Sequence, residues 1–521
     1  MLRKYIFLAT LAIISVTSAV AQSSDTLFVR YDNRFKANAV IPLEGADSLM
    51  FYPSNVRIYQ GDKSTARTYT SILPNLAGEF SFVNPGRILL QANQYSGNNY
   101  TNEQATSGYN FSHSMESDHY AVFWDVRYGN DPTKIQYPGD GNVANAKTIL
   151  NICERCWDKY VELGFIVPGA STTDKYKIQL YIPYQKEWRA DAAGDWGVGY
   201  VGKTGIGHFN PWAAVARGGH TVAHEVGHTF QYLVSADIDE NHGWRWGYTS
   251  DGSGDCGWWE SCADWQAYQL FPERQFTDGE YFEQHLANHH LNLLHEDWRY
   301  ACCYIQDYWV MKYGKDFIGR MWRETQKPED PVQTYKRMNG LTQDQFNDEM
   351  MEGYMRMATW DIDGVRERAA HRIGQHKNYL KKVSGTTATY KSDVDHCIQN
   401  YGYTIINMKT ANAGTEVKAE FTGLAGADGW NKVNTQYAGW RYAFVALSSD
   451  GTRTYGTVQK DKEGTASLIV PENCTNLFFV VMGAPTQHWP HPWTSGKASS
   501  SWPQNEEQWP FQVAFVNTTV K

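Results

Sequence analysis

Short apolar runs separated by turn residues mark both ends of the chain, whereas its centre shows helical periodicity. Residues 26–31 alternate apolar and polar positions as a half-buried strand does, and turn residues follow. The pattern returns near the C-terminus, where residues 441–447 and 477–482 are mostly apolar between Gly, Asp and Asn turns. We therefore predict an N-terminal β module over residues 22–112 and a C-terminal β-sandwich over residues 385–521.

The region 113–384 combines predicted strands with predicted helices. Residues 119–125 and 177–182 are strand-like, and residues 144–163 place apolar side chains at helical spacing. Beyond about residue 259 helices predominate, over about 259–270, 297–313, 315–325 and 343–357. Mixed elements followed by helices alone are typical of an α+β domain, so we predict an α+β fold for this region.

The N-terminus has the pattern of a secretory signal peptide. Arg3 and Lys4 precede a short apolar run, and Ala19-Val20-Ala21 forms a small-x-small cleavage site. No later stretch approaches the roughly 20 apolar residues that a membrane-spanning helix needs. We expect residues 1–21 to be removed, the mature protein to be secreted or periplasmic, and no membrane span to be present.

The charge of the chain argues against polyanionic partners. The formal net charge is −9, and it becomes −11 when Arg3 and Lys4 leave with the leader. Nucleic acids and anionic membranes attract basic surfaces, so we expect neither as a main partner.

The eight cysteines permit disulfides in an exported protein without fixing their pairing. Cys256 and Cys262 flank Glu260, and a bridge between them would stiffen that segment. Cys153 and Cys156 form a C-x-x-C pair within a predicted helix, which does not favour a redox role.

The central chemical feature is the motif His224-Glu-Val-Gly-His228. On a helix, His224 and His228 lie one turn apart on the same face, so both imidazoles can reach one metal ion. Glu225 projects from the neighbouring face, where it can act as a general base. Catalytic zinc sites use three protein ligands and leave one position open. We therefore predict one Zn²⁺ per chain.

Glu260 is the third ligand we predict for this zinc. Asp264 lies one helical turn beyond Glu260, so it is placed to accept a hydrogen bond from a ligating histidine and to fix its tautomer. Glu240 and Asp264 are the alternative ligands.

The predicted chemistry is hydrolysis by zinc-activated water, with Glu225 taking the proton. The oxyanion that forms needs a further donor. We assign this catalytic role to Tyr300, and the alternatives are Tyr304, Tyr308, His289, His290 and His295.

These motifs resemble the gluzincin group of zinc metallopeptidases, in which a glutamate ligand and an Asp four residues on follow an H-E-x-x-H helix. The stretch from His224 to Gln231 is similar to the H-E-x-G-H-x-x-Q form of enhancin-like, mucin-directed peptidases. The arrangement also looks like a family of secreted bacterial proteins of unassigned function, over about residues 115–521. The resemblance implies a zincin-like catalytic domain over residues 113–384.

By the same resemblance, the Gly-rich strand around Tyr200–His208 would be the edge strand that pairs with an extended peptide. Tyr200 and Gly202 would then contact the substrate.

Three functional hypotheses follow. The first is a secreted zinc metalloendopeptidase that hydrolyses peptide bonds of protein or glycoprotein substrates. The alternative is a glycan- or protein-binding module on a zincin scaffold that holds zinc without turnover. Glu225 argues against the alternative, because a pure binder has no use for that carboxylate. Metal-assisted hydrolysis of a non-peptide bond is a third, weaker hypothesis.

Overall fold

The computed structural model contains both helices and several β-sheets, which confirms the mixed α+β composition. It describes residues 108–193, 204–244, 257–277, 281–490 and 506–521, together with 14–15, 26–31, 34, 36–46, 48–52, 55–59, 66–69 and 77–81. Tyr200, Gly202 and Cys256 lie outside these residues, as does the predicted signal peptide apart from residues 14–15.

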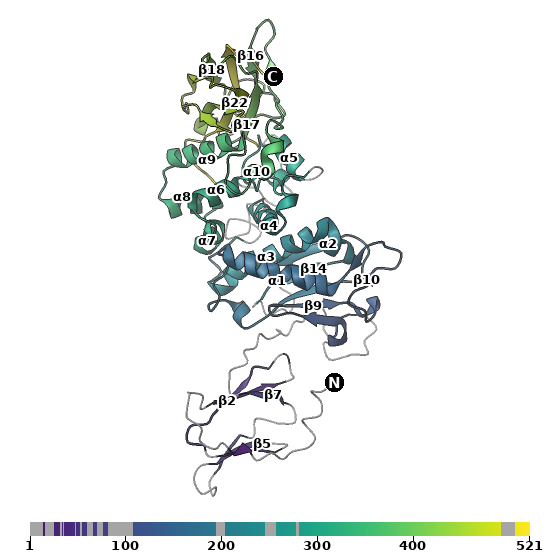
Figure 1. The fold of residues 1–521 in the computed structure, drawn as a ribbon. Coiled ribbons are helices and arrows are strands. Elements are labelled where there is room, and N and C mark those ends of the chain that lie inside the picture. The colour runs from purple at the N-terminus through teal and green to yellow at the C-terminus, as the bar shows by residue number, and fades with distance from the viewer. Residues whose placement is uncertain are drawn as a thin grey trace.

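The N-terminal strands form two small antiparallel sheets at one end of the molecule (Figure 1). The first sheet has the order β1-β4-β5-β6 and the second the order β3-β2-β7. Their bounds are β1 Ile14–Ser15, β2 Thr26–Tyr31, β3 Ala39–Pro42, β4 Ser48–Tyr52, β5 Asn55–Tyr59, β6 Ala66–Tyr69 and β7 Ala77–Ser81.

A five-stranded sheet of order β13-β14-β12-β9-β8 follows. β9, β12 and β14 are parallel, while β8 and β13 are antiparallel to their neighbours at the two edges. The strand bounds are β8 Ser114–Glu116, β9 Tyr120–Trp124, β12 Ile178–Ile182, β13 Ala190–Ala193 and β14 Ile206–Phe209. A small hairpin joins β10 Ile135–Gln136 to β11 Val143–Ala144.

Helices α1 (Ala146–Glu162) and α3 (His220–Asp237) pack against each other and against this sheet. Tyr120, Val122 and Trp124 of β9 face the helices, because alternate residues of a strand point to opposite sides. The residues between them, Ala121 and Phe123, belong to a separate cluster on the other face. α2 (Pro211–Val215) leads into α3 through a tight turn.

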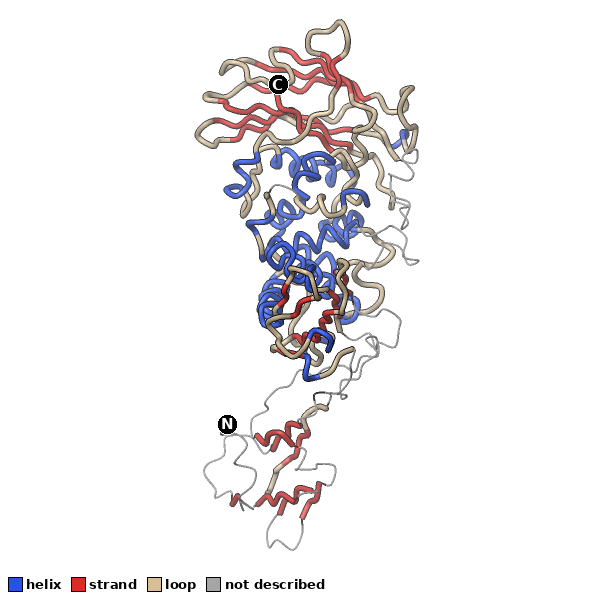
Figure 2. Tube along the Cα trace, turned by 90° about the vertical axis from the view of Figure 1, so that its right-hand side faces the viewer, coloured by secondary structure: helices blue, strands red, loops and turns tan. Residues whose placement is uncertain are grey.

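Helices alone fill the next region, between the sheet and the C-terminal domain (Figure 2). They are α4 Gly257–Leu270, α5 Tyr281–Asn288, α6 Ile305–Tyr313, α7 Phe317–Glu324, α8 Pro331–Asn339, α9 Gln343–Met357 and α10 Arg366–Ala369. The prediction of one helix over 297–313 was wrong in its first half. A single 3-10 turn at Glu296–Trp298 precedes a non-helical segment there, and the buried Ala301, Cys302 and Cys303 pack from that segment.

Two antiparallel sheets pack face to face at the C-terminal end, with the orders β15-β16-β23-β18-β21 and β17-β22-β19-β20. The outer face of the second sheet is also buried, because Ile405, Val445 and Val480 join the core of the helical region. The bounds are β15 Lys381–Lys382, β16 Thr389–Lys391, β17 Tyr403–Met408, β18 Glu416–Gly423, β19 Trp440–Ser448, β20 Arg453–Tyr455, β21 Glu463–Ile469, β22 Cys474–Gly483 and β23 Phe511–Val516.

The suggested bridge between Cys256 and Cys262 is not formed, since Cys262 is a free thiol. Its sulfur faces the protein interior on α4 and accepts a hydrogen bond from the indole N–H of Trp322 at 3.1 Å. Among the described helices, none combines the length and the apolar character needed to cross a membrane.

Candidate metal centre

The motif helix α3 lies directly against α4, which carries Glu260. Gly227 lies at this contact. A Cβ atom there would lie 3.1 Å from Gln266 Oε1 and 3.5 Å from the Cα of Ala263, so it would touch the backbone of α4 and displace the Gln266 amide slightly. The glycine of His-Glu-Val-Gly-His thus lies where the two helices are in close contact.

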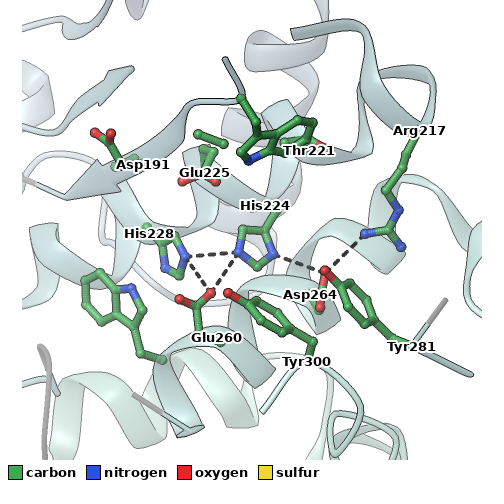
Figure 3. A pocket seen from close by; sticks show the side chains of 14 residues that line it. Asp191, Arg217, Thr221, His224, Glu225, His228, Glu260, Asp264, Tyr281 and Tyr300 are labelled. Atoms are coloured by element: carbon green, nitrogen blue, oxygen red, sulfur yellow. Dashed lines mark hydrogen bonds and ion pairs between the residues drawn. The ribbon is translucent and has the colours of Figure 1, made fainter. Parts of the chain in front are cut away.

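Three acceptor atoms from these helices converge on one point (Figure 3). His224 Nε2 lies 3.0 Å from Glu260 Oε2, and His228 Nε2 lies 3.2 Å from the same oxygen. The two Nε2 atoms are 3.1 Å apart. All three residues are buried, and theirs is the one such group found in the part of the chain that the structure describes.

The far side of each imidazole is held by a hydrogen bond. His224 Nδ1 lies 3.1 Å from Asp264 Oδ1, and His228 Nδ1 lies 3.0 Å from Gln231 Oε1. The amide nitrogen of Gln231 donates to Trp259 O and Gln266 Oε1, at 3.2 and 2.9 Å. Its oxygen therefore faces His228 and must accept, so the imidazole carries its proton on Nδ1.

The same argument places the proton of His224 on Nδ1, because the Asp264 carboxylate can only accept. Both Nε2 atoms then present lone pairs to each other and to the Glu260 carboxylate, an arrangement that is repulsive unless a cation lies between them. Tetrahedral zinc with bonds of about 2.0–2.1 Å holds its ligand atoms about 3.3 Å apart. The distances of 3.0–3.2 Å between the three acceptors fit such an ion.

The electrostatics of the group also favour positive charge. Burial alone would lower the pKa of His224, but the carboxylates of Asp264 and Glu260 raise it well above its usual value. Burial would raise the pKa of Glu260, but the adjacent His228 and His224 hold it well below its usual range. At Glu225, burial outweighs the lowering effect of His224 and, together with the nearby carboxylates, raises the pKa to about 8.

A cavity of about 220 Å³ opens over the three ligand atoms. Its floor is formed by α3 and α4, and one wall is β13. The residues that line it are Trp188, Ala190, Asp191, Ala192, Arg217, Thr221, His224, Glu225, His228, Trp259, Glu260, Asp264, Tyr281 and Tyr300.

Among the described strands, the edge strand beside the cavity is β13. β14, which includes His208 from the end of the strand predicted around Tyr200–His208, lies inside the sheet between β12 and β13. For this described part the edge position implied by the resemblance is wrong, because strand order depends on which segments pair, whereas Tyr200 and Gly202 lie outside the described residues.

Among the predicted oxyanion donors, the structure brings only Tyr300 to the cavity. Its ring stacks on Tyr281 with centroids 4.9 Å apart and lies 6.0 Å from the ring of His224. Burial and the nearby Glu260 raise the pKa of Tyr300, so the hydroxyl remains a donor.

The alternatives to Tyr300 lie elsewhere and have other partners. Tyr304 donates to Gln275 O at 2.7 Å, and Tyr308 donates to Glu352 at 2.8 Å. The three histidines contact residues of the C-terminal domain, namely His289 with Tyr403, His290 with His396 and His295 with Glu506. Glu240 is exposed beyond the end of α3.

The sequence pointed to none of the roles of Gln231, Arg217, Thr221, Tyr281 and Trp188. The spacing of Gln231, three residues after His228 on one helix, would have allowed its assignment. The other four come to the cavity through tertiary contacts, and no local pattern marks them.

Comparisons with known proteins give a family but no activity. A protein-family model described as a family of unknown function (DUF6055) matches residues 83–521. No curated protein matches the chain. Among solved structures, a mitogen derived from Yersinia pseudotuberculosis is similar at 10% identity, over 26% of this chain and 85% of that chain, with a TM-score of 0.16. A score this low supports no structural argument.

Proposed function

The chain belongs to the DUF6055 family, and we propose that this member is an exported zinc-dependent peptidase with a zincin-like catalytic domain. The observation that supports the proposal best is the convergence of His224 Nε2, His228 Nε2 and Glu260 Oε2 within 3.2 Å of one another. The basic and apolar start of the sequence supports export.

The donor set fits zinc in type as well as in spacing. Two imidazole nitrogens and one carboxylate oxygen are ligands of catalytic zinc sites, which leave a fourth position open. Asp264 and Gln231 would hold the two histidines in the ligating tautomer. Zinc in such a site polarises a carbonyl group and lowers the pKa of water to about 7.

Two side chains of the cavity would serve the reaction directly. Glu225 lines the cavity without joining the ligand group, and a bound Zn²⁺ would lower the pKa of this carboxyl group, so that its carboxylate would be placed to take a proton from the attacking water. The protonated hydroxyl of Tyr300 would donate a hydrogen bond to the oxyanion that develops on the scissile carbonyl.

β13 supplies a way to hold an extended substrate. As the edge strand of the described sheet it offers backbone N–H and C=O groups, and Ala190–Ala192 line the cavity. The small side chains of Ala190 and Ala192 leave room for a peptide beside the ligand atoms. A polypeptide substrate is therefore favoured over a compact small molecule.

One observation favours the alternative of a glycan-binding module. Trp188 and Trp212 are 46% and 45% exposed, and their rings meet edge-to-face at 5.4 Å beside the cavity. Exposed aromatic faces suit stacking on sugar rings, so a glycoprotein substrate is consistent with both functions.

The test compares wild type with Glu225→Gln. Both proteins should hold about one zinc per chain, because Glu225 is not a ligand. Wild type should cleave members of a casein and mucin panel, and the variant should lose at least a factor of about 100 in kcat/KM. Equal inertness of both proteins across the panel would overturn the peptidase proposal and favour the binding module.

A further inference from the structure

The cavity has opposite charges at its two ends. Figure 3 shows Asp191 on one side of the paired histidines and Arg217 on the other. Among the described residues that line the cavity, Arg217 is the one guanidinium or ammonium group. A substrate that crosses the ligand atoms would meet a cation at that end.

An unusual turn places Arg217 at the cavity. Arg217, Gly218 and Gly219 all have positive φ, at 53°, 67° and 100°. A non-glycine residue in this region is uncommon and is retained when its surroundings require it. The reversal lets the Arg217 side chain reach back over the cavity, where its guanidinium lies 5.0 Å from the centre of the Tyr281 ring.

The start of α3 lies at the same end. Its N-cap, Gly219, provides no side-chain hydrogen bond, and the positive end of the helix dipole is directed there. Thr221 is in the first turn, is 7% exposed and lines the cavity. Within the described residues, its hydroxyl has no hydrogen-bond partner.

We propose that Arg217 and Thr221 form a subsite that binds a carboxylate of the substrate beside the metal centre. The guanidinium can give paired hydrogen bonds to a carboxylate, and the Thr221 hydroxyl can add a third. The carboxylate is either an Asp or Glu side chain next to the scissile bond or the C-terminal carboxylate of the peptide. The inference rests on the proposed peptidase function and deepens it by naming a substrate feature.

A purely structural role for Arg217 makes a different prediction. Its Nη1 lies 3.8 Å from Asp264 Oδ1. In a purely structural role, Arg217 would do no more than neutralise the carboxylate that orients His224. In that case a substitution would weaken zinc binding and slow every substrate alike. A subsite instead changes the discrimination between charged and neutral substrates.

The experiment uses the zinc-loaded mature chain and matched fluorogenic peptides. One pair is C-terminally amidated and differs only in Glu against Gln next to the scissile bond. A second pair lacks acidic residues and differs only in a free against an amidated C-terminus. Wild type should prefer the charged member of one pair by roughly 10- to 100-fold in kcat/KM, the range for hydrogen bonds to a charged group. The preferred pair identifies the source of the carboxylate.

Three variants test the assignment. Arg217→Gln should bring the preference to about 1, Arg217→Lys should retain part of it, and Thr221→Val should reduce it several-fold without removing it. Circular dichroism serves as the folding control for each variant, and zinc content shows whether the substitution acts through the metal ligands. A wild-type preference near 1, or a preference that survives in Arg217→Gln, overturns the subsite while leaving the peptidase proposal intact.

A binding measurement separates the two proposals. N-acetylglutamate and its uncharged analogue N-acetylglutaminamide, in which both carboxylates are replaced by amides, are titrated into zinc-loaded wild type and Arg217→Gln by calorimetry. If no peptide is cleaved, the peptidase proposal fails, but tighter binding of the glutamate probe that Arg217→Gln removes still supports the subsite. Equal binding of the two probes to wild type overturns it.

Discussion

The candidate metal centre and the junction between the helices and the C-terminal sheets both bury histidines, but the rings have different partners. In the metal centre, His224 and His228 turn their Nε2 atoms towards each other and towards Glu260. At the junction, His285 places Nδ1 2.8 Å from the carbonyl of Ala301 and Nε2 3.2 Å from the hydroxyl of Tyr403.

The two clusters differ in whether carboxylates lie beside the buried rings. Burial alone would lower the pKa of both His224 and His285, but carboxylates reverse the effect at His224, whereas His285 has no such partner and its pKa falls to about 3. His289 behaves like His285, with a pKa lowered to about 4. Buried histidines alone therefore do not mark a candidate metal site. What sets the His224 group apart is that its ring nitrogens converge and have carboxylate partners.

The largest expected effect is the loss of zinc when a histidine of the candidate metal centre is replaced, with no loss when a histidine of the junction is replaced. His224→Ala should reduce the zinc content from about one per chain to near zero, since it removes one of three ligands. His285→Ala should leave the zinc content unchanged, although it deletes a fully buried side chain and lowers stability. Metal analysis after gel filtration makes the measurement. Unchanged zinc in His224→Ala would mean that the centre is wrongly placed.

Tyr300→Phe should reduce kcat by roughly 100- to 1,000-fold, the cost of losing one oxyanion donor, with unchanged zinc content. Tyr281→Phe is the matched control, because its ring stacks on Tyr300 and the substitution keeps that ring. Steady-state kinetics on a cleaved peptide would measure both. Equal effects in the two variants would remove Tyr300 from the catalytic role.

Asp264→Asn tests the hydrogen bond that distinguishes His224 from the junction histidines. The amide keeps the shape of the side chain but removes its charge, so the affinity for zinc should fall by roughly 10- to 100-fold. Competition with a chelator of known affinity measures the change. Wild-type affinity in this variant would show that the bond is not needed to hold the ligand.

The smallest expected effect is on the pH dependence of the free energy of unfolding, through His285 at the junction. The pKa of His285 is lower in the folded chain than its usual value of 6.5, so the folded state binds fewer protons than the unfolded state between pH 6.5 and about 3. The contribution of this group to stability is thus complete above pH 6.5 and is lost as the pH falls, by about 1.4 kcal/mol per pH unit.

Replacing the titrating ring should flatten this slope. His285→Gln keeps a donor and an acceptor without a titrating group, so its free energy of unfolding should fall less steeply than that of wild type between pH 6.5 and 5. Urea unfolding of zinc-loaded protein at several pH values measures both slopes. Parallel slopes would mean that His285 does not remain neutral in the fold.

Local sequence patterns predicted correctly which residues lie close together when those residues belong to the same helix or strand. His224 and His228 share a face because they are four residues apart on a helix, and Glu260 and Asp264 share a face for the same reason. The helix predicted over 144–163 corresponds to α1 (Ala146–Glu162). The mixed α+β composition likewise followed from periodicity that each segment carries by itself.

The same patterns were misleading or silent where the distance depends on packing between elements. A helix was expected through Tyr300, but the residue lies in a non-helical segment that faces the cavity. The family resemblance implied an edge position for the strand that ends at His208, but β14 pairs on both sides, because the pairing of distant segments decides which strand is last.

The sequence by itself determined a helix with two histidines on one face, a glutamate beside them, and a glutamate and an aspartate on a second helix. Tertiary structure alone decided that these helices bring three acceptor atoms within 3.2 Å of one another, that Tyr300 rather than its alternatives reaches the cavity, and that Arg217 lies at its far end. The reason is physical. Helix geometry fixes neighbours within a turn, whereas contacts between segments depend on side-chain packing across the whole core.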